Sequence, residues 1–170
     1  MNNLIGLEPG IKPGIAVLED GDLMLLSEAI INVPAPVVRC ITWKNLYERY
    51  DNCPRVEDFL WGATVFMVCP WNKQTTIKHA FDTGIIYYWL LVHGVKEVNF
   101  VDTQKLHKVI QSKQQDLWHI FEYDMKKLEI WSEIWEIFMD NDGRYRENMA
   151  HIRDAYLLIR YGQEYMNKEV

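Results

Sequence analysis

A few acidic residues and one histidine stand where this sequence could support chemistry. Glu8 ends an apolar run and precedes a Pro-Gly pair, while His151 and Asp154 are three residues apart, a spacing that places both on one face of a helix. Carboxylates are the hard oxygen ligands that Mg²⁺ prefers. Each residue also has a simpler interpretation, with Glu8 as a solvated turn residue and His151 as a packed or surface histidine. Asp154 could simply form an ion pair with Arg153 or Arg160.

The cysteines and the N-terminus indicate a reducing compartment. Cys40, Cys53 and Cys69 are odd in number and widely spaced, and they lack zinc-ligand spacing with a nearby His. An acid and two glycines interrupt the first ten residues, unlike a signal peptide. The longest apolar run, residues 85–92, is far shorter than the roughly 20 residues of a membrane helix, and it predicts a buried helix. We therefore expect a cytoplasmic protein without a membrane partner.

The net charge of the chain is concentrated in one segment. The 170 residues contain 18 Lys and Arg against 24 Asp and Glu, a net charge of -6, and the length predicts a single domain over residues 1–170. Residues 116–142 hold eight acids and two bases, so the whole deficit lies there. The sequence is thus a neutral domain with an acidic, Trp-rich helical segment, and it is not a simple basic nucleic-acid binder.

The hydrophobic pattern predicts a mixed sheet with helices. Asp20-Gly21 between two apolar runs is a strong hairpin signal, and a strand, a helix and another strand later in the chain predict a right-handed βαβ unit. Strands are expected in residues 3–7, in both arms of 15–30, and at 63–69 and 97–101. Helices are expected at 42–50, 77–93, 116–139 and 147–165.

Three stretches carry a resemblance to a known family. They are LIGLEPGIKPGIAVLEDG at 4–21, FDTGIIYYWLLVHGVKEVNFVDTQKLHK at 81–108 and HIRDAYLLIRYGQEY at 151–165. Together they resemble the RuvC-type Holliday junction resolvases, especially the phage branch. The resemblance covers most of the chain and is weakest in the acidic segment. It implies an α/β fold of the ribonuclease H-like (RuvC-type) class, a mixed five-stranded β-sheet flanked by α-helices.

The resemblance also implies a metal site. In that family two Mg²⁺ ions, held by carboxylates from the first strand, the fourth strand and the last helix, assist in-line phosphodiester hydrolysis. Carried over to this sequence, the first-strand ligand is Glu8, and the last helix supplies Asp154 and His151.

Two positions depart from the family pattern. Glu8 stands where the family nearly always has Asp, and the longer side chain alters the reach to a metal by about 1.5 Å, which octahedral Mg²⁺ tolerates poorly. The fourth strand has Val68 or Cys69 where the family has Glu. Asp102, at the end of the fifth strand, could supply a replacement carboxylate, because ligands gather beyond the carboxyl ends of strands.

These features lead to two hypotheses of function. The first is a resolvase-derived protein with a degenerate metal site, catalytically impaired, that acts by binding DNA or a protein partner. The alternative is an active Mg²⁺-dependent endonuclease that cleaves Holliday junctions or other branched DNA. Basic residues that could contact phosphates flank the proposed site at Lys105, Lys108, Lys113, Arg144 and Arg146.

The acidic segment suggests a protein partner, and the resemblance suggests a second copy of the chain. Aromatic anchors within a charged rim are typical of interfaces, and the candidates here are Trp131, Trp135, Glu133 and Glu136. The alternative is that this segment packs its apolar stripe on the sheet and exposes its acids. The resemblance further implies homodimerisation through the helix that contains residues 85–92.

Overall fold

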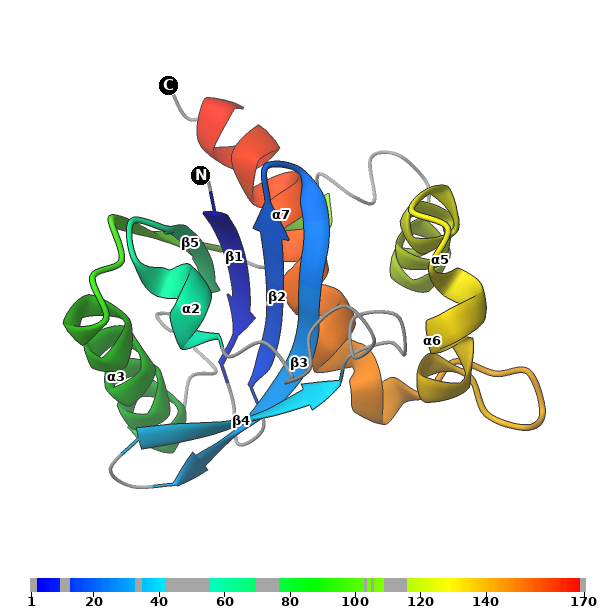
Figure 1. Ribbon diagram of the computed structural model, residues 1–170, viewed down its shortest axis with the longest axis horizontal. Helices are drawn as coiled ribbons and strands as arrows, with labels where there is room; N and C mark the ends of the chain where they lie inside the picture. Colours follow the sequence, from blue (N-terminus) through cyan, green and yellow to red (C-terminus); the bar gives the residue numbers. More distant parts are fainter. Residues whose placement is uncertain are drawn as a thin grey trace.

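The computed structural model describes residues 3–9, 13–32, 35–41, 56–69, 77–102, 104, 106–108 and 116–168, with only the backbone described at 28–32, 35–41 and 78–79. The helix expected at 42–50 lies outside these residues, as do Lys105 and Lys113. The described chain forms one mixed β-sheet with helices on both faces (Figure 1). The α/β class and the mixed sheet expected from the sequence are therefore confirmed.

The sheet contains six strands in the order β4-β3-β2-β1-β5-β6. Strands β2 (Gly14–Glu19), β3 (Asp22–Asn32) and β4 (Ala35–Ile41) continue antiparallel from β1 (Asn3–Glu8) on one side. On the other side β5 (Thr64–Val68) and β6 (Glu97–Val101) run parallel to β1. All five expected strands are present, and β4 is an additional edge strand that Pro34 and Pro36 concealed from the pattern.

Local signals explain the connections. Asp20 and Gly21 both have positive φ, 50° and 97°, as the tight turn between β2 and β3 requires. Helix α3 (Ile77–Val92) follows β5 and precedes β6, which completes the expected βαβ unit. The helix is followed by Gly94 with φ 78°, the left-handed conformation that glycine adopts at helix ends.

Side-chain alternation divides the interior into two cores. On one face of the sheet, Val65 and Met67 of β5 pack with α3 and with α2 (Glu57–Leu60). On the other face, Phe66 and Val68 pack with α7 (Ala150–Lys168) and with the helices outside it. Figure 1 shows α2 and α3 on one side of the strands and α7 on the other, with α5 and α6 beyond α7. The period-2 alternation of strand side chains produces this division.

The acidic segment is two helices instead of the continuous helix expected over 116–139. Helix α5 (Leu117–Lys127) is capped by the carboxylate of Asp116, which accepts the Trp118 N–H, and α6 (Trp131–Phe138) follows after a short turn. Glu129 in that turn has φ 59°. A left-handed residue other than glycine or asparagine leaves no recognisable signal in the sequence, and this is why the break was missed.

The last helix agrees with expectation, and α3 agrees in part. A single 3₁₀ turn, η1 (Glu147–Met149), leads into α7, which continues three residues beyond the expected end. The prediction that residues 85–92 form a buried helix is wrong for one side of α3, because Tyr88, Leu91 and Val92 are exposed while Ile86 and Leu90 are buried. Within the described chain, no helix combines the length and apolarity needed to cross a bilayer.

Candidate active site

Two glycines allow α7 to lie directly on the strands. A Cβ atom on Gly6 would be 1.7 Å from the carbonyl oxygen of Ala155, and one on Gly14 would be 1.9 Å from the carbonyl oxygen of His151. The backbones of helix and strands are therefore in contact, which only glycine permits. Gly14 pairs with Glu8 across β1 and β2, so the first turns of α7 lie beside Glu8.

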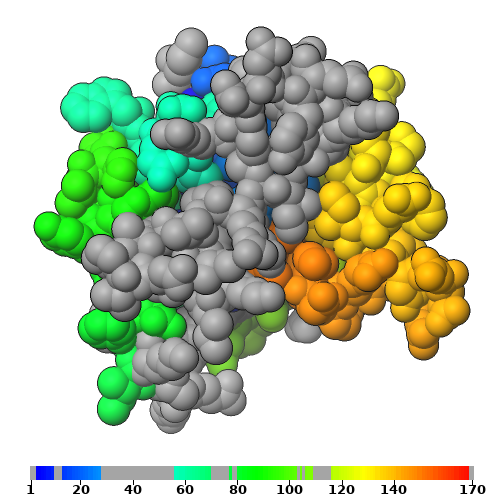
Figure 2. Space-filling model, turned by 60° about the horizontal axis from the view of Figure 1, so that its bottom comes forward, coloured from blue at the N-terminus to red at the C-terminus, as the bar shows by residue number. Residues whose placement is uncertain are grey.

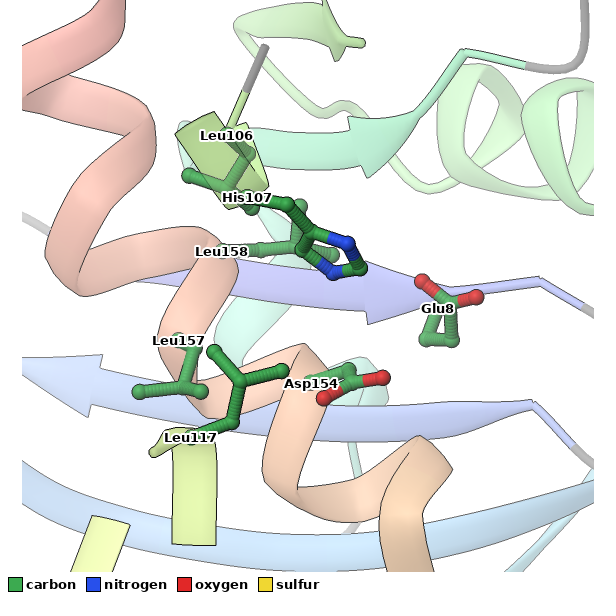
Figure 3. Close-up of a pocket in the computed structure, with 7 residues that line it drawn as sticks. All are labelled: Glu8, Leu106, His107, Leu117, Asp154, Leu157 and Leu158. Carbon is green, nitrogen blue, oxygen red and sulfur yellow. The ribbon is translucent and has the colours of Figure 1, made fainter. Parts of the chain in front are cut away.

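Glu8 and Asp154 line one pocket. The pocket encloses about 260 Å³ of empty space, part of it open to solvent, between the end of β1, the start of α7 and the residues after β6. Figure 3 shows the carboxyl groups of Glu8 and Asp154 and the imidazole of His107 turned toward this space, with leucines behind them. The remaining lining residues are Leu106, Leu117, Leu157 and Leu158. The expected pair of carboxyl groups is thus brought together by the fold.

The Glu8 carboxyl is short of polar partners. Its Oε2 atom is shielded from solvent and has no hydrogen-bond partner among the described residues. Burial, followed by the nearby Asp154 charge, raises the pKa of Glu8 to about 8, while Arg153 opposes the shift. At neutral pH, Glu8 is therefore predominantly protonated.

The Asp154 carboxylate already has a cationic partner. Arg153 Nε donates to Asp154 Oδ1 over 2.7 Å, and the Arg153 side chain is only 9% exposed. The Arg153 guanidinium also lies 4.5 Å from the centroid of the Trp118 ring, a cation–π distance. Pairing of Asp154 with Arg153 was one of the sequence alternatives, although an exposed pair was expected; Arg160 instead pairs with Asp124 at 3.4 Å.

The third carboxylate that the resemblance implies is absent from the corresponding place in the sheet. Leu7 pairs with Met67 in the parallel β1–β5 ladder, so one residue further Glu8 lies beside Val68, which is buried on the α7 face. Within the described part of the chain, no group of three or more His, Cys, Asp or Glu side chains is placed to hold a metal ion. With valine at this position and Arg153 bound to Asp154, these residues do not fit a two-Mg²⁺ site.

The other two predicted site residues lie near the pocket without lining it. Asp102 Oδ1 accepts the backbone N–H of Gln104 over 2.9 Å, which makes Asp102 the cap of the helical residues that follow β6. His151 lies on α7 one turn before Asp154, and its Nε2 atom is shielded from solvent. Neither residue supplies a replacement for the missing carboxylate.

Of the basic residues predicted to contact DNA, three lie in the described chain. Lys108 is exposed, one residue after His107 of the pocket. Arg144 forms ion pairs with Asp140 at 3.3 Å and Asp142 at 2.5 Å. Arg146 Nε donates to the carbonyl oxygen of Met139. The two arginines thus serve the acidic turn locally, and Lys108 is the predicted contact best placed for a ligand at the pocket.

The predicted partner-binding residues divide between core and surface. Trp131 packs edge-on against Phe121, with ring centroids 6.4 Å apart, whereas Trp135 is 43% exposed. Glu136 is exposed and Glu133 is half-buried. The segment packs its apolar stripe inward, as one alternative held, because α5 and α6 bury Ile120, Phe121 and Phe138. That alternative is wrong in two details, since α5 packs on α7 and the acids Glu122 and Asp124 are mostly covered.

Sequence reasoning missed the roles of His107 and Arg153. His107 lies in the QKLHK run after β6, where buried Leu106 fixes the helical turn and sets His107 at the pocket. An apolar anchor next to a histidine just beyond a strand end is a signal that could have identified it. No nearby residue in the sequence indicates that the Arg153 side chain points inward, because this orientation depends on Trp118, which is 35 positions away.

Comparison with known proteins gives no assignment of the chain. No protein-family model matches it, and no curated protein matches it. The resemblance to the resolvases therefore rests on the motifs of the chain, and the geometry above provides the basis for a proposal of function.

Proposed function

We propose that this protein is a RuvC-like, resolvase-derived protein of ribonuclease H-like fold that binds branched DNA without cleaving it. The observation that carries the proposal is the buried Val68 beside Glu8, at the position where metal-dependent cleavage needs a third carboxylate. Three hairpin strands, a βαβ unit and a final helix follow the element order of a ribonuclease H-like domain, which supports the proposed origin. Apart from β4, the described sheet agrees with that order.

The DNA-binding part of the proposal is supported by the pocket and its rim. Glu8, Asp154 and His107 line the same pocket at the carboxyl end of β1, where the resemblance implies the catalytic site, and Lys108 next to His107 is exposed. A lysine at this place can contact a phosphate, which orients the nucleic acid without reading its sequence. A protein that kept the DNA-binding surface of a resolvase and lost cleavage would have both the resolvase-like motifs and the altered carboxylate set.

The test is binding and cleavage of a synthetic four-way junction, with a linear duplex of the same length as control. We expect preferential retardation of the junction and no cleavage with either Mg²⁺ or Mn²⁺. Lys108→Glu should weaken binding several-fold, whereas Lys127→Glu, in the last turn of α5, should not. Cleavage that is abolished by Glu8→Gln would overturn the proposal in favour of the alternative, an Mg²⁺-dependent endonuclease. Failure to bind either DNA would also overturn it.

A second candidate function is recognition of a protein partner by the acidic segment. The observation that favours it is the exposure of Trp135 beside Glu136 on α6, an aromatic side chain within an acidic surface. A partner with a basic surface would complement this charge. If this is correct, Trp135→Ala with Glu136→Lys should abolish capture of such a partner and leave junction binding unchanged.

We also propose a homodimer formed through α3. Tyr88 is 70% exposed and Phe81 63%, and Leu91 and Val92 lie on the same side of the helix. Trp61, after α2, is 83% exposed and has its ring against Gly94. Apolar patches of this kind mark interaction surfaces, and a dimer would present two pockets to a junction of two-fold symmetry.

A further inference from the structure

Besides the valine at position 68, the contacts of one side chain contribute to the misfit between the pocket and a metal centre. Arg153 and Asp154 are consecutive on α7, and consecutive helix residues do not face each other. Their ion pair at 2.7 Å therefore requires the Arg153 side chain to be directed back to its neighbour. This contact is not a default of helix geometry, so another part of the molecule must hold it.

The acidic segment supplies that support. The Arg153 guanidinium lies over the ring of Trp118 at the start of α5, and the Tyr145 ring also stacks with Trp118, with centroids 5.1 Å apart and planes parallel within 2°. Trp118 Nε1 donates to Glu147 Oε1 over 2.9 Å, and the Tyr145 hydroxyl donates to Glu122 Oε2. We call Arg153, Trp118 and Tyr145 the stacked column. Each ring of the column is fixed by a carboxylate.

We infer that Arg153 is a built-in cation that neutralises Asp154 in place of a bound divalent metal ion, and that the stacked column holds it there. A guanidinium stays charged at all relevant pH values and binds a carboxylate through directed N–H groups. One of the two Asp154 carboxylate oxygens, Oδ1, already accepts a hydrogen bond from the positively charged Arg153 side chain, which neutralises the charge that would attract a metal ion. Displacing the guanidinium would leave a buried charge without its partner, which is strongly unfavourable.

The inference rests on the proposed origin of the pocket and adds a role for the acidic segment. The interactions above link neither Glu8 nor Asp154 directly to Trp118, Tyr145 or Glu122. These three residues nevertheless determine the position of the Arg153 charge. Arg153 is thus a positioning residue for the pocket, and the α5 helix is part of the device that closes the site to divalent cations.

Binding of Mn²⁺, followed by electron paramagnetic resonance and by the shift of the thermal midpoint, tests the inference. The unaltered protein should bind no more Mn²⁺ than Asp154→Asn does. Arg153→Met should release Asp154 and increase Mn²⁺ affinity at least tenfold, with a thermal midpoint that rises with Mn²⁺ concentration. Arg160→Met, on the same helix but paired with Asp124, is the matched control and should show no gain.

Two further variants make the test decisive. Trp118→Phe keeps a ring under the guanidinium but loses the hydrogen bond to Glu147, and it should give a smaller gain in the same direction. If Arg153→Met fails to fold, the Mn²⁺ affinity of Trp118→Phe alone tests the inference. A folded variant without increased Mn²⁺ affinity overturns the inference, as does an unaltered protein that binds Mn²⁺ as tightly as Arg153→Met. Junction binding is measured without added metal, so its outcome is separable from these results.

Discussion

The two faces of the sheet place their charged and aromatic side chains in opposite ways. On the α7 side, two carboxylates are paired with arginines: Asp154 with the buried Arg153, and Asp124 with Arg160, whose side chain is half exposed. On the α3 face the interior is apolar, while the rings of Trp61 and Tyr88 are exposed. Figure 2 shows α2 and α3 on one side of the molecule and α5 and α6 on the opposite side.

The difference teaches which groups serve the fold and which are available to a partner. The carboxylates of Asp154 and Asp124 on the α7 side are compensated by arginines of the same chain, which offsets the cost of removing charge from water. On α3, the exposed side chains of Tyr88, Leu91 and Val92 would be stabilised by a second surface. The α3 side is thus the better candidate for association with another protein surface.

The largest expected effect on stability comes from replacing glycine on the two sides of the sheet. Gly6→Ala forces a Cβ into the Ala155 carbonyl oxygen, so we expect a loss of more than about 4 kcal/mol of unfolding free energy, at the severe end for single substitutions. Gly84→Ala, on α3, meets nothing within 4 Å and should stabilise the protein by about 0.5–1 kcal/mol. Chemical denaturation of both variants provides the measurement. Equal changes in unfolding free energy for the two variants would contradict the close packing of α7 on β1 at Gly6.

The next largest effect is the pH dependence of stability that arises from the buried Glu8 carboxyl. The folded pKa of Glu8, about 8, lies above its ordinary value of 4.5, so the folded state binds the additional proton between these pH values. Stability from this group is therefore present below pH 4.5, falls as the pH rises toward 8, and is lost above it. With partial exposure of the side chain taken into account, the difference is on the order of 3 kcal/mol.

Glu8→Gln tests this sign, because an amide resembles the protonated carboxyl in shape and stays neutral. We expect the variant to match the unaltered protein at pH 5 and to exceed it at pH 9 in urea denaturation. A variant that is less stable than the unaltered protein at pH 9 would contradict the internal placement of this carboxyl.

The smallest effect on stability is expected on the α3 face. Tyr88→Glu with Leu91→Glu changes exposed side chains, so the unfolding free energy of the isolated chain should change by less than about 0.5 kcal/mol. Self-association, measured by analytical ultracentrifugation, should nevertheless be lost. The control adds the same two negative charges on the opposite side of the molecule, at exposed Ser132 and Asn141 (Ser132→Glu, Asn141→Glu). A monomer at all concentrations before substitution would overturn the proposed homodimer.

Part of the fold and of the site followed from local sequence. The Asp20-Gly21 turn, the glycine after α3 and the alternation of β5 are short-range signals, and each predicted the observed element. Strand β4 and the break at Glu129 lacked such signals, because an edge strand tolerates proline and a left-handed glutamate is fixed by its surroundings. Glu8 and Asp154 were predicted as a pair only through the resemblance of their motifs.

The sequence by itself determined which side chains are available to the site: a glutamate at the end of β1, a valine where the resemblance implies a third carboxylate, and an aspartate on the last helix. Only the tertiary structure decided the electrostatic state of those groups. The burial of Glu8, the direction of Arg153 and the stacking of Trp118 on Tyr145 depend on residues far apart in the chain. Desolvation and ion pairing arise from the whole packed environment, and for that reason no local pattern encodes them.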